Sequence, residues 1–336
     1  MKNYKPAILV FILAMLMLAS CMRSPDCFRE NIFCAALVTD PLGINDHGIN
    51  HDTWAGLEQS KADGVIDQIS YIESVDTRDY EKNIAYFAQK GYDVIMTTGA
   101  GLRDETLRAA DLYPDAIFIG MNQPQEESRP NLIPISFAED QMGFFAGALA
   151  AYLTKTHIVG AVCETSAIDS MWRYCEGFRA GAYYVDKEIK VLVEYRDNGS
   201  QEKLLIDEAW GSERAQYLMK QGADVIFASG GATGQGALRS TAESGIYAIG
   251  TERDQAAALG ESSSSLVTSI YGRADFEIQT IMRSIKDGNF NKPVFGQFGY
   301  IAFNDKFPED LRQKMDDLLS RLINGNVQTN ISPHKP

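Results

Sequence analysis

The sequence is poor in the residues that build metal centres and catalytic sites. Its four histidines are scattered, and none of its five cysteines forms a CxxC pair, so the spacing does not fit a zinc site. No GxSxG motif is present, and no motif fixes two carboxylates about a scissile bond. We therefore expect a protein with no metal, no cofactor and no catalytic residues, and we expect that it is not an enzyme.

Positive charge is also scarce. The 336 residues contain 31 lysines and arginines against 45 aspartates and glutamates, which gives a net charge of -14. So acidic a protein gains little from a phosphate backbone, and we expect no nucleic-acid partner. The excess of negative charge keeps a surface protein soluble.

Long hydrophobic runs are missing except near the N-terminus. Lys2 and Lys5 precede an almost wholly apolar run at 7–18, which is too short for a comfortable transmembrane helix and is typical of a signal-peptide core. Leu-Ala-Ser precedes Cys21, the pattern of a lipoprotein cleavage site. We expect a signal peptide at 1–20, a lipid on Cys21, a tether at 21–32 and anchoring on the extracytoplasmic face of the cell membrane. The alternative is an ordinary signal peptide followed by an incidental cysteine.

Four further cysteines would remain after export: Cys27, Cys34, Cys163 and Cys175. Export makes disulfides possible. The spacing does not select a pairing, and buried free thiols are an equal alternative.

From residue 33 onward, short apolar runs alternate with amphipathic segments. We expect strands at 33–38, 68–72, 94–96 and 116–119, with helices at 52–62, 80–89 and 104–112. This alternation predicts an α/β fold with parallel, doubly wound sheets.

The second half of the chain repeats the first. Residues 90–95 (KGYDVI) resemble residues 221–226 (QGADVI), and the offset of 130–131 holds over about thirty positions. Such a repeat is too long for a solenoid and predicts two Rossmann-like lobes joined by a hinge. We place one lobe at 33–155 plus about 268–290, the other at 156–267 plus about 291–310, and a C-terminal helix and tail at 311–336. The expected crossings are 154–157, 262–269 and 288–293.

Ligands of doubly wound sheets bind beyond the carboxyl ends of the strands. The segments that follow predicted strands are therefore the candidates: 39–50, 98–101, 122–123, 164–174, 229–234 and 252–255. Asn122 and Glu252 occupy equivalent positions in the repeat, so we expect them to face each other between the lobes.

Several of these segments resemble the basic membrane protein (Bmp) family. Residues 38–50 (VTDPLGINDHGIN) are similar to its opening pattern TDxGGIxDxSFN, and residues 249–255 (IGTERDQ) to its IGVDsDQ. Three more family-like segments lie in order at 144–151, 177–182 and 222–236. The resemblance covers about 33–305.

The resemblance implies a type I periplasmic-binding fold and a surface lipoprotein that delivers a small ligand to an ABC permease. Characterised relatives often receive purine nucleosides, whose base lies between aromatic rings. By position, Asp40 and Asn50 match the first motif, and Phe227 matches a phenylalanine that could stack on a base.

Four positions depart from the family pattern. Ile49 replaces a stacking phenylalanine, Asn122 an aspartate that reads the base, Glu252 a ribose-binding aspartate and Gly272 a lysine. Arg273 could supply the missing positive charge. These changes leave the fold untouched and open the question of nucleoside specificity.

The remaining ligand candidates are Asp46, Trp172, Tyr174 and Gly230. Asp46, like Asp40, has an alternative role as a turn or N-cap residue. Trp172 and Tyr174 are expected in a loop facing the site, and Gly230 in a tight turn that approaches the ligand. Phe227 could equally be a core residue.

We therefore expect a binding protein for a nucleoside or a similar polar ligand, working by hinge closure. A sensor that docks on a membrane receptor, an exported nucleoside or sugar hydrolase, and an adhesin are the alternatives.

Overall fold

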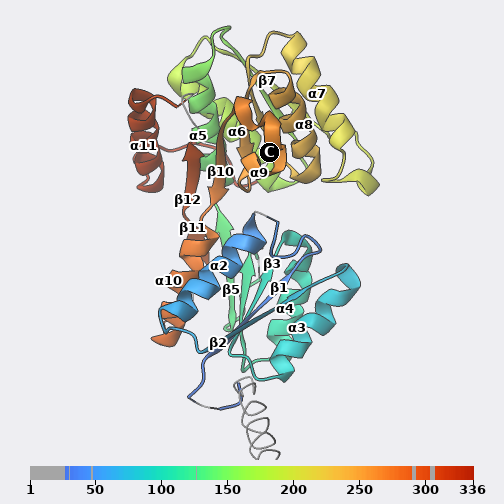
Figure 1. Ribbon diagram of the computed structural model, residues 1–336, viewed down its shortest axis with the longest axis vertical. Helices are drawn as coiled ribbons and strands as arrows, with labels where there is room; N and C mark the ends of the chain where they lie inside the picture. The colour runs from blue at the N-terminus through green and yellow to red at the C-terminus, as the bar shows by residue number, and fades with distance from the viewer. Residues whose placement is uncertain (1–26, 30, 47, 126, 290–292, 303–306) are drawn as a thin grey trace, which may run out of the picture.

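The computed structural model describes residues 27–336 apart from 30, 47, 126, 290–292 and 303–306. Over this range the chain folds into two lobes, stacked end to end, each built on a six-stranded sheet (Figure 1). The predicted signal peptide, Cys21 and the first part of the predicted tether lie outside the described residues.

The first lobe is a fully parallel sheet with helices on both faces. Its strands are β1 (Cys34–Thr39), β2 (Gln68–Glu73), β3 (Val94–Thr98), β4 (Ile117–Met121), β5 (Leu132–Phe137) and β11 (Val294–Gly296), in the order β11-β5-β4-β3-β1-β2. Helices α2 (Ile49–Ala62) and α10 (Ala274–Lys286) pack together, and α3 (Tyr80–Gln89) packs with α4 (Arg103–Leu112) on the other face. All six residues of β1 are buried, as expected for a parallel strand covered on both sides.

The second lobe repeats this plan. Its strands are β6 (Ile158–Cys163), β7 (Lys190–Tyr195), β8 (Val225–Ala228), β9 (Tyr247–Thr251), β10 (Leu266–Gly272) and β12 (Phe298–Ala302), in the order β12-β10-β9-β8-β6-β7. Only β12 is antiparallel to its neighbour in this sheet. Its helices are α5 (Glu139–Leu153), α6 (Asp169–Val185), α7 (Glu208–Lys220), α8 (Gly231–Glu243), α9 (Gln255–Leu259) and α11 (Glu309–Ile323). Short 3-10 helices stand at Thr77–Asp79, Ala100–Leu102, Gln201–Lys203 and Gly260–Ser265.

Helices α5 and α6 pack backbone against backbone, and glycine makes this possible. A Cβ placed on Gly147 would fall 1.9 Å from the carbonyl oxygen of Phe178, and one on Gly181 would fall 1.9 Å from that of Phe144. No larger residue fits at the two points where these helices touch. The family-like segments at 144–151 and 177–182 therefore form a closely packed helix pair.

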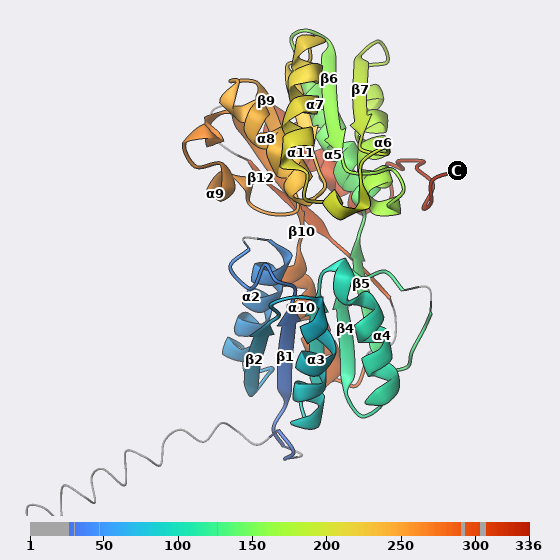
Figure 2. The same ribbon diagram turned by 90° about the vertical axis from the view of Figure 1, so that its right-hand side faces the viewer.

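The chain crosses between the lobes at three points, which differ from the predicted ones. The crossings lie between β5 and α5, between β10 and α10, and between β11 and β12, as Figure 2 shows at the waist of the molecule. The predicted first-lobe boundary at 155 is corrected to about 138, because α5 packs on α6 and against the second sheet. β10 belongs wholly to the second sheet and β11 to the first, contrary to the boundaries expected near 268 and 291.

The four described cysteines form two disulfides. Cys27 bonds to Cys34, which links the segment before β1 to that strand. Cys163 at the end of β6 bonds to Cys175 in α6. The structure therefore favours disulfides over the alternative of buried free thiols.

Candidate functional site

The loops that follow β1 and β9 meet between the two lobes. Nη1 of Arg253, two residues after β9, donates a hydrogen bond to the carbonyl oxygen of Asp46 in the loop after β1, with a distance of 3.0 Å. The carboxyl ends of the two sheets therefore face each other, as predicted. We call the polar side chains at these strand ends the inter-lobe site.

Asp40 is held at the end of β1 by a hydrogen-bond network. Its carboxylate accepts hydrogen bonds from the Asn50 amide (2.8 Å) and from the backbone N–H of Leu42 (3.0 Å). Asn50 is fully buried and also accepts a hydrogen bond from the Thr98 hydroxyl. Burial raises the pKa of Asp40, and the two hydrogen bonds offset only part of that effect. Asp40 is half-buried and can face a ligand, whereas Asn50 is a support for it.

Asp46 closes the first turn of α2. Its carboxylate accepts hydrogen bonds from the backbone N–H groups of Gly48 (2.8 Å), Asn50 (3.2 Å) and His51 (3.0 Å). These are N–H groups that a helix start leaves unpaired. The geometry thus corresponds to the capping alternative for Asp46, and the helix begins at Ile49, three residues before the predicted start.

Asn122 and Glu252 are the first residues after β4 and β9, and they share an unusual backbone. Their φ angles are 56° and 72°, in the left-handed region that few residues other than glycine adopt. Both are exposed, and Asn122 makes no side-chain hydrogen bond to any described residue. Non-glycine residues in this region cost about 1–3 kcal/mol and cluster at ligand-binding sites.

Glu252 projects toward the start of α8. The Glu252 carboxylate interacts with the backbone N–H groups of Gly230 and Gly231, where the helix dipole favours negative charge. Surrounding protein desolvates this carboxylate and raises its pKa, although water still reaches the side chain. Desolvation together with access to water is expected of a side chain that projects between the two lobes. Gly230 has φ 105°, and a Cβ there would fall 2.6 Å from Cβ of Glu164, so only glycine fits.

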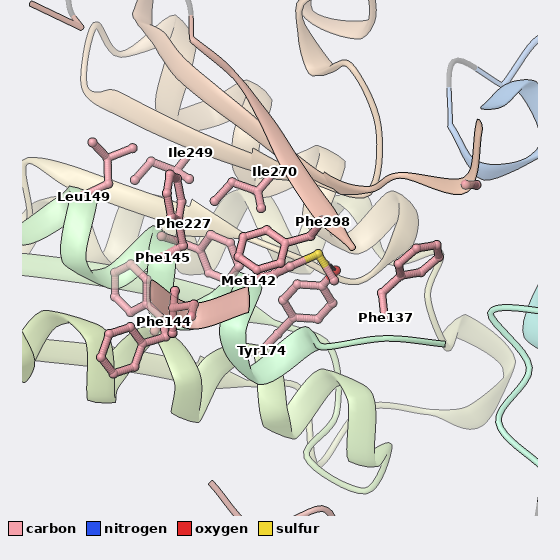
Figure 3. Packing of buried hydrophobic residues seen from close by; sticks show 14 of the residues in the cluster. Phe137, Met142, Phe144, Phe145, Leu149, Tyr174, Phe227, Ile249, Ile270 and Phe298 are labelled. Carbon is pink, nitrogen blue, oxygen red and sulfur yellow. Dashed lines mark hydrogen bonds between the residues drawn. The ribbon is translucent and has the colours of Figure 1, made fainter. Parts of the chain in front are cut away.

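The structure places Phe227 and Tyr174 in the core, and not on a ligand-facing surface. Phe227 is fully buried and stacks on Phe178, with ring centroids 5.3 Å apart and planes at 10°. Tyr174 is 4% exposed, and its hydroxyl contacts the sulfur of Met142 (Figure 3). The structure corresponds to the core alternative for Phe227 and places Tyr174 in the core as well, because both rings point into the packing between the sheet and the helices α5 and α6.

Trp172 and Tyr174 lie in α6, and not in a loop as predicted. The helix begins at Asp169, and both residues fall within its first two turns. Trp172 is half-buried, and its carbonyl oxygen accepts a hydrogen bond from the Tyr195 hydroxyl at 3.5 Å.

Arg273 lies at a crossing between the lobes. It is the residue before α10. Its guanidinium is 3.5 Å from the Asp275 carboxylate and lies over the Phe276 ring. A Cβ on Gly272 would fall 2.4 Å from the ring of Phe137, so Phe137 occupies the space of any side chain at 272. Ile49 packs against the core of the first lobe.

Two residues near the site were not singled out as ligand contacts, although Arg253 lies within the candidate segment 252–255. Arg253 makes the contact between the lobes described above. Tyr271, near the end of β10, is half-buried. Burial raises the pKa of its hydroxyl, and Arg273 lowers that pKa. The carboxylates of Asp52 in the first lobe and Asp254 in the second raise it further. Its position beside Gly272 and Arg273 was the available signal, since those two residues were already candidates.

Metal binding and membrane crossing find no support in the described residues. No group of three or more His, Cys, Asp or Glu side chains is arranged to hold a metal ion within them. In the same part of the chain, no helix has both the length and the apolar character needed to cross a membrane.

Two doubly wound lobes joined by three crossings, with polar side chains at facing strand ends, define a type I periplasmic binding protein. The model of the Bmp family, described as ABC transporter substrate-binding protein PnrA-like, matches residues 33–307. The chain belongs to this family. It is a solute-binding protein of ABC transporters and not an enzyme.

Known proteins match this chain in sequence or in structure over most of its length. The CD4+ T-cell-stimulating antigen of Listeria innocua is 26% identical over 340 residues, covering 94% of this chain and 92% of that protein. The ABC transporter nucleoside-binding protein BmpA of Lactococcus lactis is 28% identical over 273 residues, covering 76% of each. The solved structure of an ABC transporter solute-binding protein from Conexibacter woesei matches with a TM-score of 0.70 at 23% identity, covering 88% of this chain and 98% of that one.

Proposed function

We propose that this protein captures a nucleoside between its lobes and delivers it to an ABC permease. The observation that carries the proposal is the pair of carboxylates Asp40 and Glu252, presented from the strand ends of opposite lobes. Carboxylates accept hydrogen bonds from sugar hydroxyls and from ring N–H groups, both of which nucleosides offer. The name of the Lactococcus lactis relative, which states nucleoside binding, supports the same ligand class.

The other groups of the proposed site complete this chemistry. Asn122 offers an amide that can donate to and accept from a base edge. Because Phe227 and Tyr174 are buried, we assign the aromatic contact to Tyr271, which is half-buried among charges of both lobes. Trp172, Gly230 and Arg273 remain proposed contacts.

Ligand binding to the chain that begins at residue 22 tests the proposal. We expect adenosine, guanosine or inosine to raise the melting temperature, since a ligand at 100 times its Kd adds about 2.7 kcal/mol of stability. Asp40→Asn and Glu252→Gln should each weaken binding by about 1.5–3 kcal/mol, which is the range for hydrogen bonds to charged groups. Asp287→Asn is the matched control, because Asp287 is exposed at the end of α10. A response to other small molecules but to no nucleoside would reject the ligand assignment.

We further propose that a lipid on Cys21 anchors the protein on the extracytoplasmic face of the membrane. The support is the apolar run at 7–18 followed by Leu-Ala-Ser-Cys. In a bacterial host, radioactive palmitate should label the full chain and should not label Cys21→Ser. Equal labelling of both proteins would contradict the anchor.

A further inference from the structure

Arg253 connects the two halves of the inter-lobe site through both its backbone and its side chain. Its backbone N–H donates to the carbonyl oxygen of Thr251 at 2.9 Å. This bond closes a three-residue turn around Glu252, whose φ of 72° is that of the rare and strained γ-turn. The turn fixes the direction in which Glu252 leaves β9.

The Arg253 side chain reaches the opposite lobe. Its Nη1 donates to the Asp46 carbonyl oxygen at 3.0 Å, across 207 positions of sequence. A Cβ placed on Gly48 would fall 3.2 Å from Cβ of Arg253, so the two loops are packed against each other at this point. The guanidinium is half-buried, and a charged donor makes a stronger hydrogen bond than a neutral one.

From Asp46 the connection continues to the other carboxylate. The Asp46 carboxylate accepts a hydrogen bond from the Asn50 backbone N–H, and the Asn50 amide donates to Asp40. A continuous path therefore runs from Glu252 through Arg253 and the Asp46 loop to Asp40. Each member is oriented by its neighbour, so the spacing of the two carboxylates depends on the hydrogen bond that Arg253 makes between the lobes.

We propose that Arg253 is a positioning residue that sets the separation of the lobes in the ligand-free protein, and with it the distance between Asp40 and Glu252. The effect on ligand affinity rests on the proposed function. The effect on lobe separation does not, because it is measured without ligand.

Spin labels on the two lobes measure the separation. Glu81→Cys in α3 and Glu243→Cys in α8 are exposed positions whose carboxylates make no hydrogen bond or ion pair with described residues. Double electron–electron resonance on the chain from residue 22, with its disulfides intact, gives the distribution of distances. We expect Arg253→Gln to shift this distribution to longer distances and to broaden it. Arg253→Lys, which keeps a charged donor, should restore most of the original distribution.

Arg239→Gln is the matched control. Arg239 lies on α8 and pairs with Glu208 within the same lobe, so this variant loses the same charge without touching the contact between the lobes. An unchanged distribution in Arg253→Gln, or an equal shift in Arg239→Gln, would overturn the proposal. Near-ultraviolet circular dichroism verifies that each variant is folded.

Guanosine is then added as the probe. We expect Arg253→Gln to bind it about tenfold more weakly than the unmodified chain, with Arg253→Lys between them. Weaker binding without any shift in the ligand-free distribution would mean that Arg253 touches the ligand directly, which also overturns the positioning role. If guanosine binds no variant, the nucleoside assignment fails, while the ligand-free distances still decide the role of Arg253.

Discussion

Replacing Phe227 by alanine should damage the stability of the protein far more than its ligand affinity. The ring is fully buried and stacks on Phe178, whose centroid is 5.3 Å away. Truncating a buried phenylalanine to alanine costs about 3–5 kcal/mol, since transfer free energy is lost and a cavity remains. A typical domain has only about 5–15 kcal/mol of stability, so the change removes a large share of it.

Urea unfolding followed by circular dichroism measures this loss. Phe295→Ala is the matched control, because Phe295 is 79% exposed and its removal should change stability by less than about 0.5 kcal/mol. A loss below about 1 kcal/mol in Phe227→Ala, together with a large loss of nucleoside affinity, would refute this reasoning. It would mean that Phe227 leaves the core to contact the ligand.

Three further predictions concern a desolvated carboxylate, a disulfide and a buried ion pair. The folded pKa of Glu252 is raised above 4.5, so its native carboxylate binds a proton more tightly than the unfolded one, and stability falls as pH rises above 4.5. Glu252→Gln should remove this fall and be the more stable protein at pH 7. If the urea midpoints of Glu252→Gln and of the unmodified chain change with pH by the same amount from pH 4.5 to 8, the prediction is contradicted. Replacing Cys163 and Cys175 by alanine should cost about 3 kcal/mol in calorimetry, as expected for a short disulfide loop. Reductant should lower the melting temperature of the unmodified chain at least as far, because it also opens the Cys27–Cys34 disulfide. Arg196→Met leaves the buried Glu164 without its cation and should cost about 3–5 kcal/mol of unfolding free energy. Adding Glu164→Gln should recover part of that loss. If the losses of the two single variants simply add in the double variant, the two side chains are not coupled.

The positions of helices and strands could be predicted from the sequence because local patterns determine them. The alternation of apolar runs and amphipathic segments placed α3 at its observed bounds of 80–89 and the other predicted elements within a few residues. The start of α2 was missed by three residues because Asp46 caps it from a distance. The offset repeat predicted two lobes of one design, and the two sheets have the same strand order apart from the antiparallel β12.

The lobe boundaries could not be predicted in the same way. An apolar run shows that a segment is buried, but it does not show which of two similar sheets the segment joins. β11 has three residues and enters the first sheet, while β12 begins two residues later in the second. The placement of α5 depends on glycine contacts with α6, which are set by the tertiary fold.

The sequence predicts the region of the candidate site better than it predicts which side chains face that region. The strand-end argument predicted that the carboxyl ends of the two sheets face each other, and the loops of Asp46 and Arg253 meet there. They do not show which side chain of a strand points toward the ligand, because a parallel strand is buried on both faces. Phe227 and Tyr174 were therefore indistinguishable from ligand contacts by pattern alone. The Arg253 contact joins residues 207 positions apart, and no local pattern contains it.

The two lobes also differ where their shared design is most strained. Asn122 and Glu252 follow equivalent strands, and both have a left-handed backbone. Asparagine tolerates that conformation better than glutamate does. At Glu252 the conformation is held by the turn that Arg253 closes and by the Gly230 and Gly231 N–H groups around its carboxylate. Backbone strain and desolvation of charge both oppose folding, and both act on Glu252. A ligand that donates hydrogen bonds to Glu252 would compensate for the desolvation, so ligand binding would offset a cost that folding alone leaves at this residue.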